Sequence, residues 1–94
     1  MKNSYLSDIM AHYGQAKAAT RSSTCKAYIA YIYGDAVLLQ QDLCCSENDG
    51  DGQILAAKLA RQCKMLLNAD MLEVESLMDR IIDESINEVK KYFA

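Results

Sequence analysis

Apolar residues recur every three or four positions along most of the chain, which is the spacing of one face of an α-helix. Near the start, Ile9, Tyr13 and Ala16 form this pattern. It predicts a first helix that ends before the polar stretch 20–24 and a second helix that runs from about residue 25 towards residue 46. The acidic, glycine-containing cluster 47–52 then separates these from a third helix around residues 55–66.

The last predicted helix has the clearest pattern. Its apolar residues advance by three or four positions, close to the 3.6 of a straight helix. They are Met71, Val74, Met78, Ile82, Ile86, Val89 and Phe93. Asp70 suits the N-cap position, and Lys90 and Lys91 near the end complement the helix macrodipole. We therefore expect a helix from about residue 71 to residue 93.

Residues 25–42 admit a second interpretation. The segment 27–33 is rich in β-forming residue types, and Gly34-Asp35 would suit the turn of a hairpin. The strands would have no polar face, however, and the helical period continues through Gly34, which costs only about 1 kcal/mol inside a helix. We expect an all-α bundle of three or four helices in a single domain, residues 1–94, with an α+β fold containing a hairpin at about 25–42 as the alternative.

Composition adds a reason to expect association. The chain has 94 residues, of which 51% are apolar. A chain of this size buries only about 60–65% of the surface that its unfolded form exposes, so its core is marginal. Four helices would offer more apolar faces than one small core covers, which predicts a homodimer or a larger oligomer formed through the last helix. Neither a membrane span nor a signal peptide is expected, which places the protein in the cytoplasm.

The cysteines are expected to be reduced core thiols. They are Cys25, Cys44, Cys45 and Cys63. Their spacing does not match a zinc site, and the only histidine is His12. A redox or disulfide role is the alternative interpretation.

The acidic segment before the third helix resembles the first half of an EF-hand calcium loop. With Gly52 at the sixth position, Asp49 and Asp51 occupy the third and fifth. The twelfth position, which should supply a glutamate, is Lys58. We therefore expect a flexible acidic loop, with no metal and no cofactor.

Residues 15–33 match the spacing of a helix-turn-helix. The matching positions are Gln15, Ala19, Ser23, Ile29 and Ile32. The preceding helix resembles the first helix of small phage Cro-type regulators, which implies DNA binding. The residues that would contact DNA are Gln15, Lys17, Arg21 and Lys26. Since the second helix carries no arginine, asparagine or glutamine to read bases and the net charge is −3, DNA binding is kept as the alternative function.

Catalysis is not expected. His12 has no convincing nucleophile at helical spacing, and carboxylate pairs such as Asp79 and Asp83 are typical of a solvated helix face. Clustered tyrosines and methionines instead favour protein binding. The expected partner or self-association surface consists of Tyr28, Tyr31, Met71, Val74, Met78, Ile82, Ile86 and Phe93.

The leading functional hypothesis is a small regulatory protein that binds another protein and has no enzymatic activity. In size, acidity and lack of a catalytic motif the chain resembles the small inhibitors and antirepressors encoded by phages and mobile elements. That resemblance implies a partner such as a repressor or a defence complex.

Overall fold

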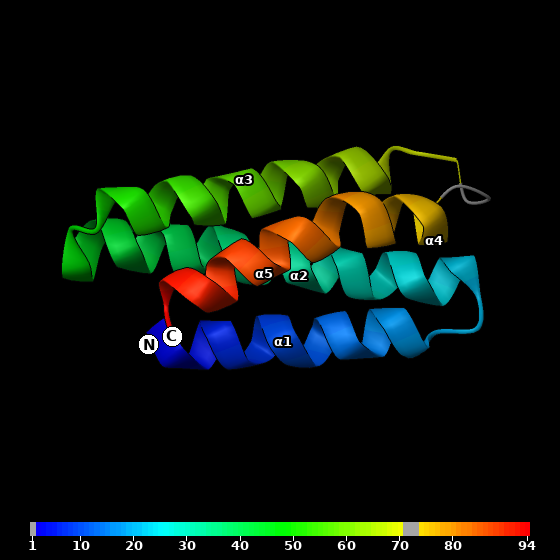
Figure 1. Cartoon of the computed structure of the whole chain (residues 1–94), viewed down its shortest axis with the longest axis horizontal. Helices are drawn as coiled ribbons and strands as arrows, with labels where there is room; N and C mark the ends of the chain where they lie inside the picture. The colour runs from blue at the N-terminus through cyan, green and yellow to red at the C-terminus, as the bar shows by residue number, and fades with distance from the viewer. Residues whose placement is uncertain (1, 71–73) are drawn as a thin grey trace.

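The computed structural model describes residues 2–70 and 74–94, and it shows an all-α bundle (Figure 1). The described residues contain no strand, so the hairpin alternative for residues 25–42 is wrong and the all-α prediction is confirmed. In chain order the elements are α1 (Lys2–Ala18), α2 (Ser22–Asp42), the π-helical turn η1 (Leu43–Glu47), α3 (Gly50–Leu67), α4 (Val74–Leu77), the π-helical turn η3 (Met78–Ile82) and α5 (Asp83–Tyr92).

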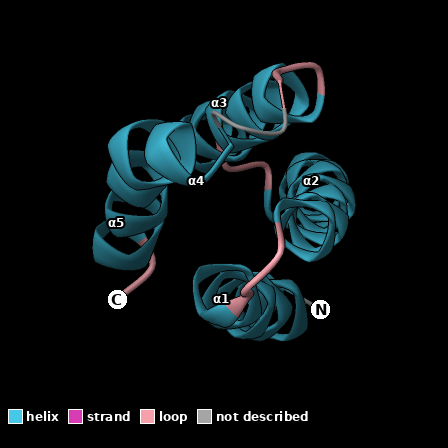
Figure 2. Ribbon diagram, turned by 90° about the vertical axis from the view of Figure 1, so that its right-hand side faces the viewer, coloured by secondary structure: helices cyan, strands magenta, loops and turns pink. Residues whose placement is uncertain are grey.

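The helices run up and down the long axis of a molecule that measures 39 × 19 × 19 Å. Helices α1 and α2 are antiparallel, and α3 returns along the other side of α2 (Figure 1). The segment formed by α4, η3 and α5 closes the bundle against α3, opposite α2 (Figure 2). Helix α2 therefore lies between α1 and α3 and turns its remaining side away from the bundle.

The helix α2 forms where the hairpin had been an alternative because its inward residues follow the helical period. Five of them have no exposed surface: Cys25, Ile29, Ile32, Ala36 and Leu39. A strand would have placed these residues alternately on two faces, and only a helix brings all of them to one core. Gly34 lies on the outward side of this helix and leaves its phase unchanged.

A tight junction replaces the expected flexible acidic loop. Asn48 adopts a left-handed conformation with φ of 50°, which ends η1, and the Asp49 carboxylate then accepts a hydrogen bond of 3.0 Å from the Gly52 backbone N–H. Helix α3 consequently begins at Gly50, earlier than predicted. A Cβ atom on Gly52 would lie 2.6 Å from Oδ2 of Asp49 and 3.1 Å from Cδ1 of Leu43, so a larger residue at this position would displace the capping carboxylate.

The last helical segment contains a feature that periodicity does not reveal. A π-helical turn, Met78–Ile82, interrupts the α-helical pattern between α4 and α5.

Within the described residues, no helix combines the length and apolar character that crossing a membrane requires.

Candidate protein-binding faces

The outward side of α2 carries exposed apolar residues and no charge. Between Lys26 and Asp42 the chain has one charged residue, Asp35. Tyr31 is 57% exposed, and Leu38, two turns further along the same side, is 45% exposed. We call this surface the α2 face and define it by Ala27, Ala30, Tyr31, Gly34, Leu38 and Gln41.

An aromatic cluster borders the α2 face on its α1 side. The imidazole of His12 stacks on the ring of Tyr31, with 5.2 Å between ring centres, and on the ring of Tyr28 at 6.4 Å. Nδ1 of His12 donates to Oδ2 of Asp35 at 2.7 Å. Burial raises the pKa of the Asp35 carboxyl, and the hydrogen bond and charge of His12 partly offset that effect. The only charged residue along this stretch of α2 therefore has a partner within the chain, and the imidazole that holds it also packs against Tyr31.

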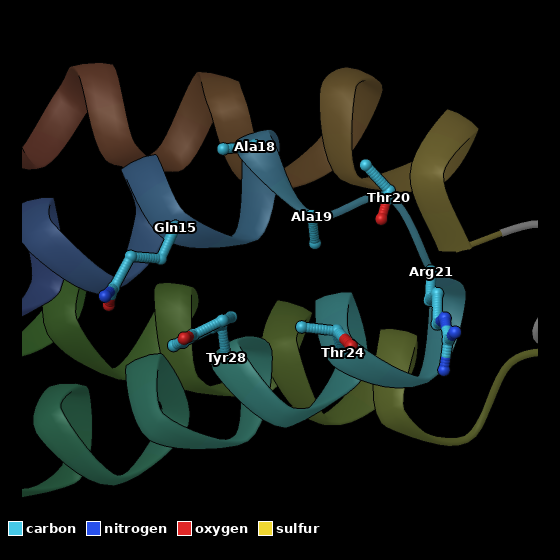
Figure 3. Close-up of a pocket in the computed structure, with 7 residues that line it drawn as sticks. All are labelled: Gln15, Ala18, Ala19, Thr20, Arg21, Thr24 and Tyr28. Atoms are coloured by element: carbon cyan, nitrogen blue, oxygen red, sulfur yellow. The ribbon is translucent and has the colours of Figure 1, made fainter.

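A hollow of about 490 Å³ lies at the turn between α1 and α2 (Figure 3). Its lining is Gln15, Ala18, Ala19, Thr20, Arg21, Thr24 and Tyr28. Since Tyr28 belongs both to this lining and to the aromatic cluster, the hollow continues onto the α1 side of α2. The Arg21 guanidinium has no hydrogen bond or ion pair with any described residue and points out at the edge of the hollow.

The outward side of α3 combines exposed apolar residues with cations. Ile54 is 64% exposed and Met65 is 59% exposed, and Arg61 lies between them on the same side of the helix. A shallow groove of about 540 Å³ surrounds Met65. We call this surface the α3 face and define it by Ile54, Lys58, Arg61, Lys64, Met65 and Asn68.

The cations of the α3 face differ in their partners. Lys58 pairs with Glu88 of α5, with 2.9 Å between Nζ and Oε1. Arg61 and Lys64 are exposed and make no hydrogen bond or ion pair with any residue that the structure describes. Within the described residues, these two cations next to the exposed Met65 are therefore available to bind an external ligand.

The apolar stripe expected to form the interface on the last helix lies mostly in the core of the chain itself. Met78, Ile82 and Ile86 are at most 3% exposed, and Phe93 packs against the same core. Met71 and the side chain of Val74 lie outside the described residues. The stripe packs against the other helices of the same chain, so Met78, Ile82 and Ile86 offer no surface to a second molecule. Of the predicted surface, Tyr31 is exposed and Tyr28 is half-buried.

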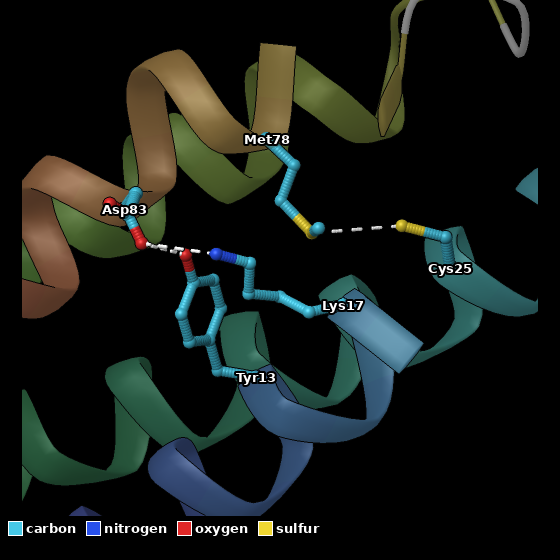
Figure 4. Close-up of polar contacts among 5 residues, drawn as sticks. All are labelled: Tyr13, Lys17, Cys25, Met78 and Asp83. Atoms are coloured by element: carbon cyan, nitrogen blue, oxygen red, sulfur yellow. Dashed lines mark hydrogen bonds and ion pairs between the residues drawn. The ribbon is translucent and has the colours of Figure 1, made fainter. Parts of the chain in front are cut away.

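Two of the predicted DNA-binding cations, Lys17 and Lys26, make polar contacts within the chain. Lys17 lies 3.6 Å from Oδ1 of Asp83, which also accepts a hydrogen bond from the Tyr13 hydroxyl (Figure 4). Lys26 donates to the carbonyl oxygens of Leu67 and Ala69 at 3.0 and 2.8 Å, and so holds the end of α3. Gln15 and Arg21 remain exposed at the turn between α1 and α2.

The geometry of residues 15–33 also differs from a helix-turn-helix. That motif sets its second helix at about 90–120° to the first, so that it can enter the major groove. Here α1 and α2 are long antiparallel neighbours joined by a short turn (Figure 1). The segment is an αα-hairpin, and its second helix lies flat along the bundle.

The cysteines divide into two pairs. Cys25 and Cys63 are buried, whereas Cys44 and Cys45 are exposed on η1, which corrects their expected place in the core. Burial raises the pKa of Cys63 to about 12, so it remains a neutral thiol at ordinary pH. Cys25 lies with its Sγ 3.7 Å from the sulfur of Met78 (Figure 4). Across the described part of the chain, no three histidine, cysteine or acidic side chains are grouped closely enough to hold a metal ion.

The exposure of Leu38, Ile54 and Met65 was not predicted from the sequence. A signal for the α2 face was present, because a helix with one charge in fifteen positions cannot cover its whole circumference with solvated side chains. For α3 the signal was that Ile54 and Met65 fall out of phase with its buried residues Ala56, Leu59 and Cys63.

Comparison of the chain with protein-family models, with curated proteins and with solved structures found no match.

Proposed function

We propose that the protein is a small, non-catalytic regulator that acts in the cytoplasm by binding another protein through the α3 face. The observation that carries this proposal is the exposure of Met65 beside Arg61 and Lys64, two cations that have no partner among the described residues. The surface stands out because the chain as a whole has a net charge of −3.

The α3 face fits an acidic segment that carries an apolar side chain. Methionine adapts its shape to different ligands, and the exposed Met65 and Ile54 would lose contact with water on binding. Arginine forms two parallel hydrogen bonds with a carboxylate, which favours Arg61 as the residue that orients the partner. Lys58 is already paired with Glu88 and supports the groove from the side of α5.

This mode of action is of the inhibitor or antirepressor type. A rigid helical bundle that offers one cationic and apolar face can cover an acidic surface of a repressor or defence complex and so block it. The proposal needs no catalytic group, because occupancy alone produces the effect. Helix α3 is suited to the task, since the Asp49 cap and the Lys26 contacts hold both of its ends.

The proposal is tested by capture from native host lysate with the full chain as bait. We compare the wild type with the double variant Arg61→Glu/Lys64→Glu and with Met65→Ser. A partner bound at the α3 face should be retained by the wild type and bound at least about tenfold more weakly by the double variant, since two attractive charges become repulsive.

The matched control is Lys90→Glu/Lys91→Glu, which makes the same change of charge at exposed positions on α5. Capture by this control should equal that of the wild type. An equal loss of capture in both double variants would show that the partner responds only to the net charge of the chain. Unchanged capture by the α3 variants would refute the proposed face. A shift of duplex DNA that Arg61→Glu/Lys64→Glu abolishes would assign the face to nucleic acid.

A further inference from the structure

We infer that the α2 face binds a second copy of this chain, with the two α2 helices antiparallel about a two-fold axis near Gly34. This contact is separate from the α3 face and goes beyond the proposed partner binding. The first support is the shape of the surface. Its large residues Tyr31 and Leu38 lie on either side of Gly34, which has open space around its Cβ position.

The α2 face is complementary to itself in the antiparallel arrangement. With Gly34 opposite Gly34, Leu38 of one copy lies within one residue of level with Tyr31 of the other, and both lean to the same flank of the contact. The two exposed apolar side chains of each copy thus cover those of the other, while Gly34 lets the helices approach closely. A contact of identical surfaces about a two-fold axis is the commonest form of protein association.

Charges at the two ends of α2 select the antiparallel direction. Arg21 precedes α2 and, as part of the hollow against α1, lies on the α1 side of the helix. Asp42 ends α2 and lies on the same side, since it follows Asp35, the partner of His12, by two turns. Neither Arg21 nor Asp42 has an oppositely charged partner among the described residues.

An antiparallel pair brings the end of α2 that carries Arg21 in one copy beside the end that carries Asp42 in the other, with the two residues about 7.5 Å apart along the helix axis. Both residues stay on the same flank of the contact, because a two-fold axis across the helices keeps each flank beside its own copy. A parallel pair would place Arg21 and Asp42 at opposite ends of the contact. The same symmetry leaves the α3 faces of both copies on one side of the dimer, since α3 flanks α2 in each copy (Figure 2). The dimer would therefore present two partner-binding faces in the same direction.

The first test is the mass of the full chain in solution, measured by light scattering and sedimentation over a range of concentrations. We expect a dimer of twice 10.5 kDa. Leu38→Asp should weaken dimerisation by at least about a hundredfold, because it buries two unpaired charges near the axis. Ile54→Asp, the same type of change at an exposed residue of α3, should leave the dimer intact.

The second test is a charge exchange. Asp42→Arg should weaken the dimer, because it places a second cation at the end of the contact where Arg21 of the other copy lies. The double variant Arg21→Asp/Asp42→Arg should restore the dimer. Rescue by the double variant is not expected if either substitution acts only through the stability of the single chain.

The third test reports on the axis itself and does not depend on weakening the fold. In a chain with Cys44→Ser and Cys45→Ser, the variant Gly34→Cys should oxidise to a covalent dimer, whereas Met65→Cys on the α3 face should not. A monomer at all concentrations, or a dimer that Ile54→Asp abolishes and Leu38→Asp does not, would overturn the inference. Loss of the α3 partner in Arg61→Glu/Lys64→Glu with an intact dimer would show that the two faces act separately.

Discussion

The α2 face and the α3 face are similar in their apolar content and differ in their charge. Each offers two large exposed apolar residues on one side of a long helix, Tyr31 and Leu38 on one and Ile54 and Met65 on the other. The α2 face carries no charge of its own, and its neighbour Asp35 is paired with His12. The α3 face carries two cations, Arg61 and Lys64, that have no partner among the described residues.

The difference in charge favours a different kind of partner at each face. An uncharged surface can meet a copy of itself without bringing like charges together, and so it suits a symmetric contact. A cationic surface would repel its own copy and needs a partner of opposite charge. The charges of the two faces therefore favour the two uses that we propose, self-association at α2 and binding of an acidic partner at α3.

The largest expected effect separates the inner and outer sides of α2. Ile32→Ala should lower the free energy of unfolding by about 2–5 kcal/mol, because it removes a fully buried side chain and leaves a cavity. In dilute, monomeric protein Leu38→Ala should change it by less than about 0.5 kcal/mol, as is usual for exposed positions. Denaturant unfolding of both variants checks the difference. A loss of more than about 2 kcal/mol in monomeric Leu38→Ala would mean that this residue belongs to the core.

That division of α2 is where prediction from the sequence reached its limit. The helical period of Ile29, Ile32 and Leu39 predicted the element, because a helix is the conformation that brings such residues to one side. The same pattern identified the outward side only in part, because Tyr31 was predicted to lie on a surface and the exposure of Leu38 was not. Alanine, tyrosine and leucine surround nearly the whole helix, and only the positions of α1 and α3 decide which of them are covered.

The last helical segment shows the converse. Its apolar period correctly predicted a helical segment, whereas the expectation that the apolar stripe forms an interface between copies was wrong for Met78, Ile82 and Ile86, which are buried in the chain itself. Met78 and Ile82 are covered because the last segment packs against the core residues of α1, α2 and α3. Chain length and periodicity contain no information on whether a helix completes the core of its own chain or contacts a second copy.

Salt is the next way to separate the two faces. Raising the salt concentration from about 0.05 to 0.5 M should weaken partner binding at the α3 face by roughly tenfold, since exposed charges are screened. Dimerisation through the α2 face should change by less than about threefold, because only the Arg21 and Asp42 contacts at its rim are screened. Titrations of dimer and partner complex at the two salt concentrations measure both. If salt weakened dimerisation and partner binding equally, the two faces would not differ in the contribution of charge to binding.

The smallest effect concerns the carboxylate that borders the α2 face. Burial raises the pKa of Asp35 above 3.8, so the stability that this group contributes is full below that pH and is lost as the pH rises through its folded pKa. Asp35→Asn does not titrate, and its stability relative to the wild type should therefore improve as the pH rises from about 3.8 towards neutrality.

Asp83 supplies a control of opposite sign. The hydrogen bond from Tyr13 lowers the pKa of Asp83, with Lys17 adding to the effect, so its contribution is present above pH 3.8 and is lost as the pH falls through its folded pKa. Asp83→Asn should be less stable than the wild type at neutral pH and approach it in acid. Unfolding curves of the three proteins between about pH 3 and pH 7 test both directions. If the stability of Asp35→Asn changed with pH in the same direction as that of Asp83→Asn, the contact with His12 would outweigh the effect of burial on the Asp35 carboxyl. The α2 face would then border on a carboxylate whose charged form is stabilised.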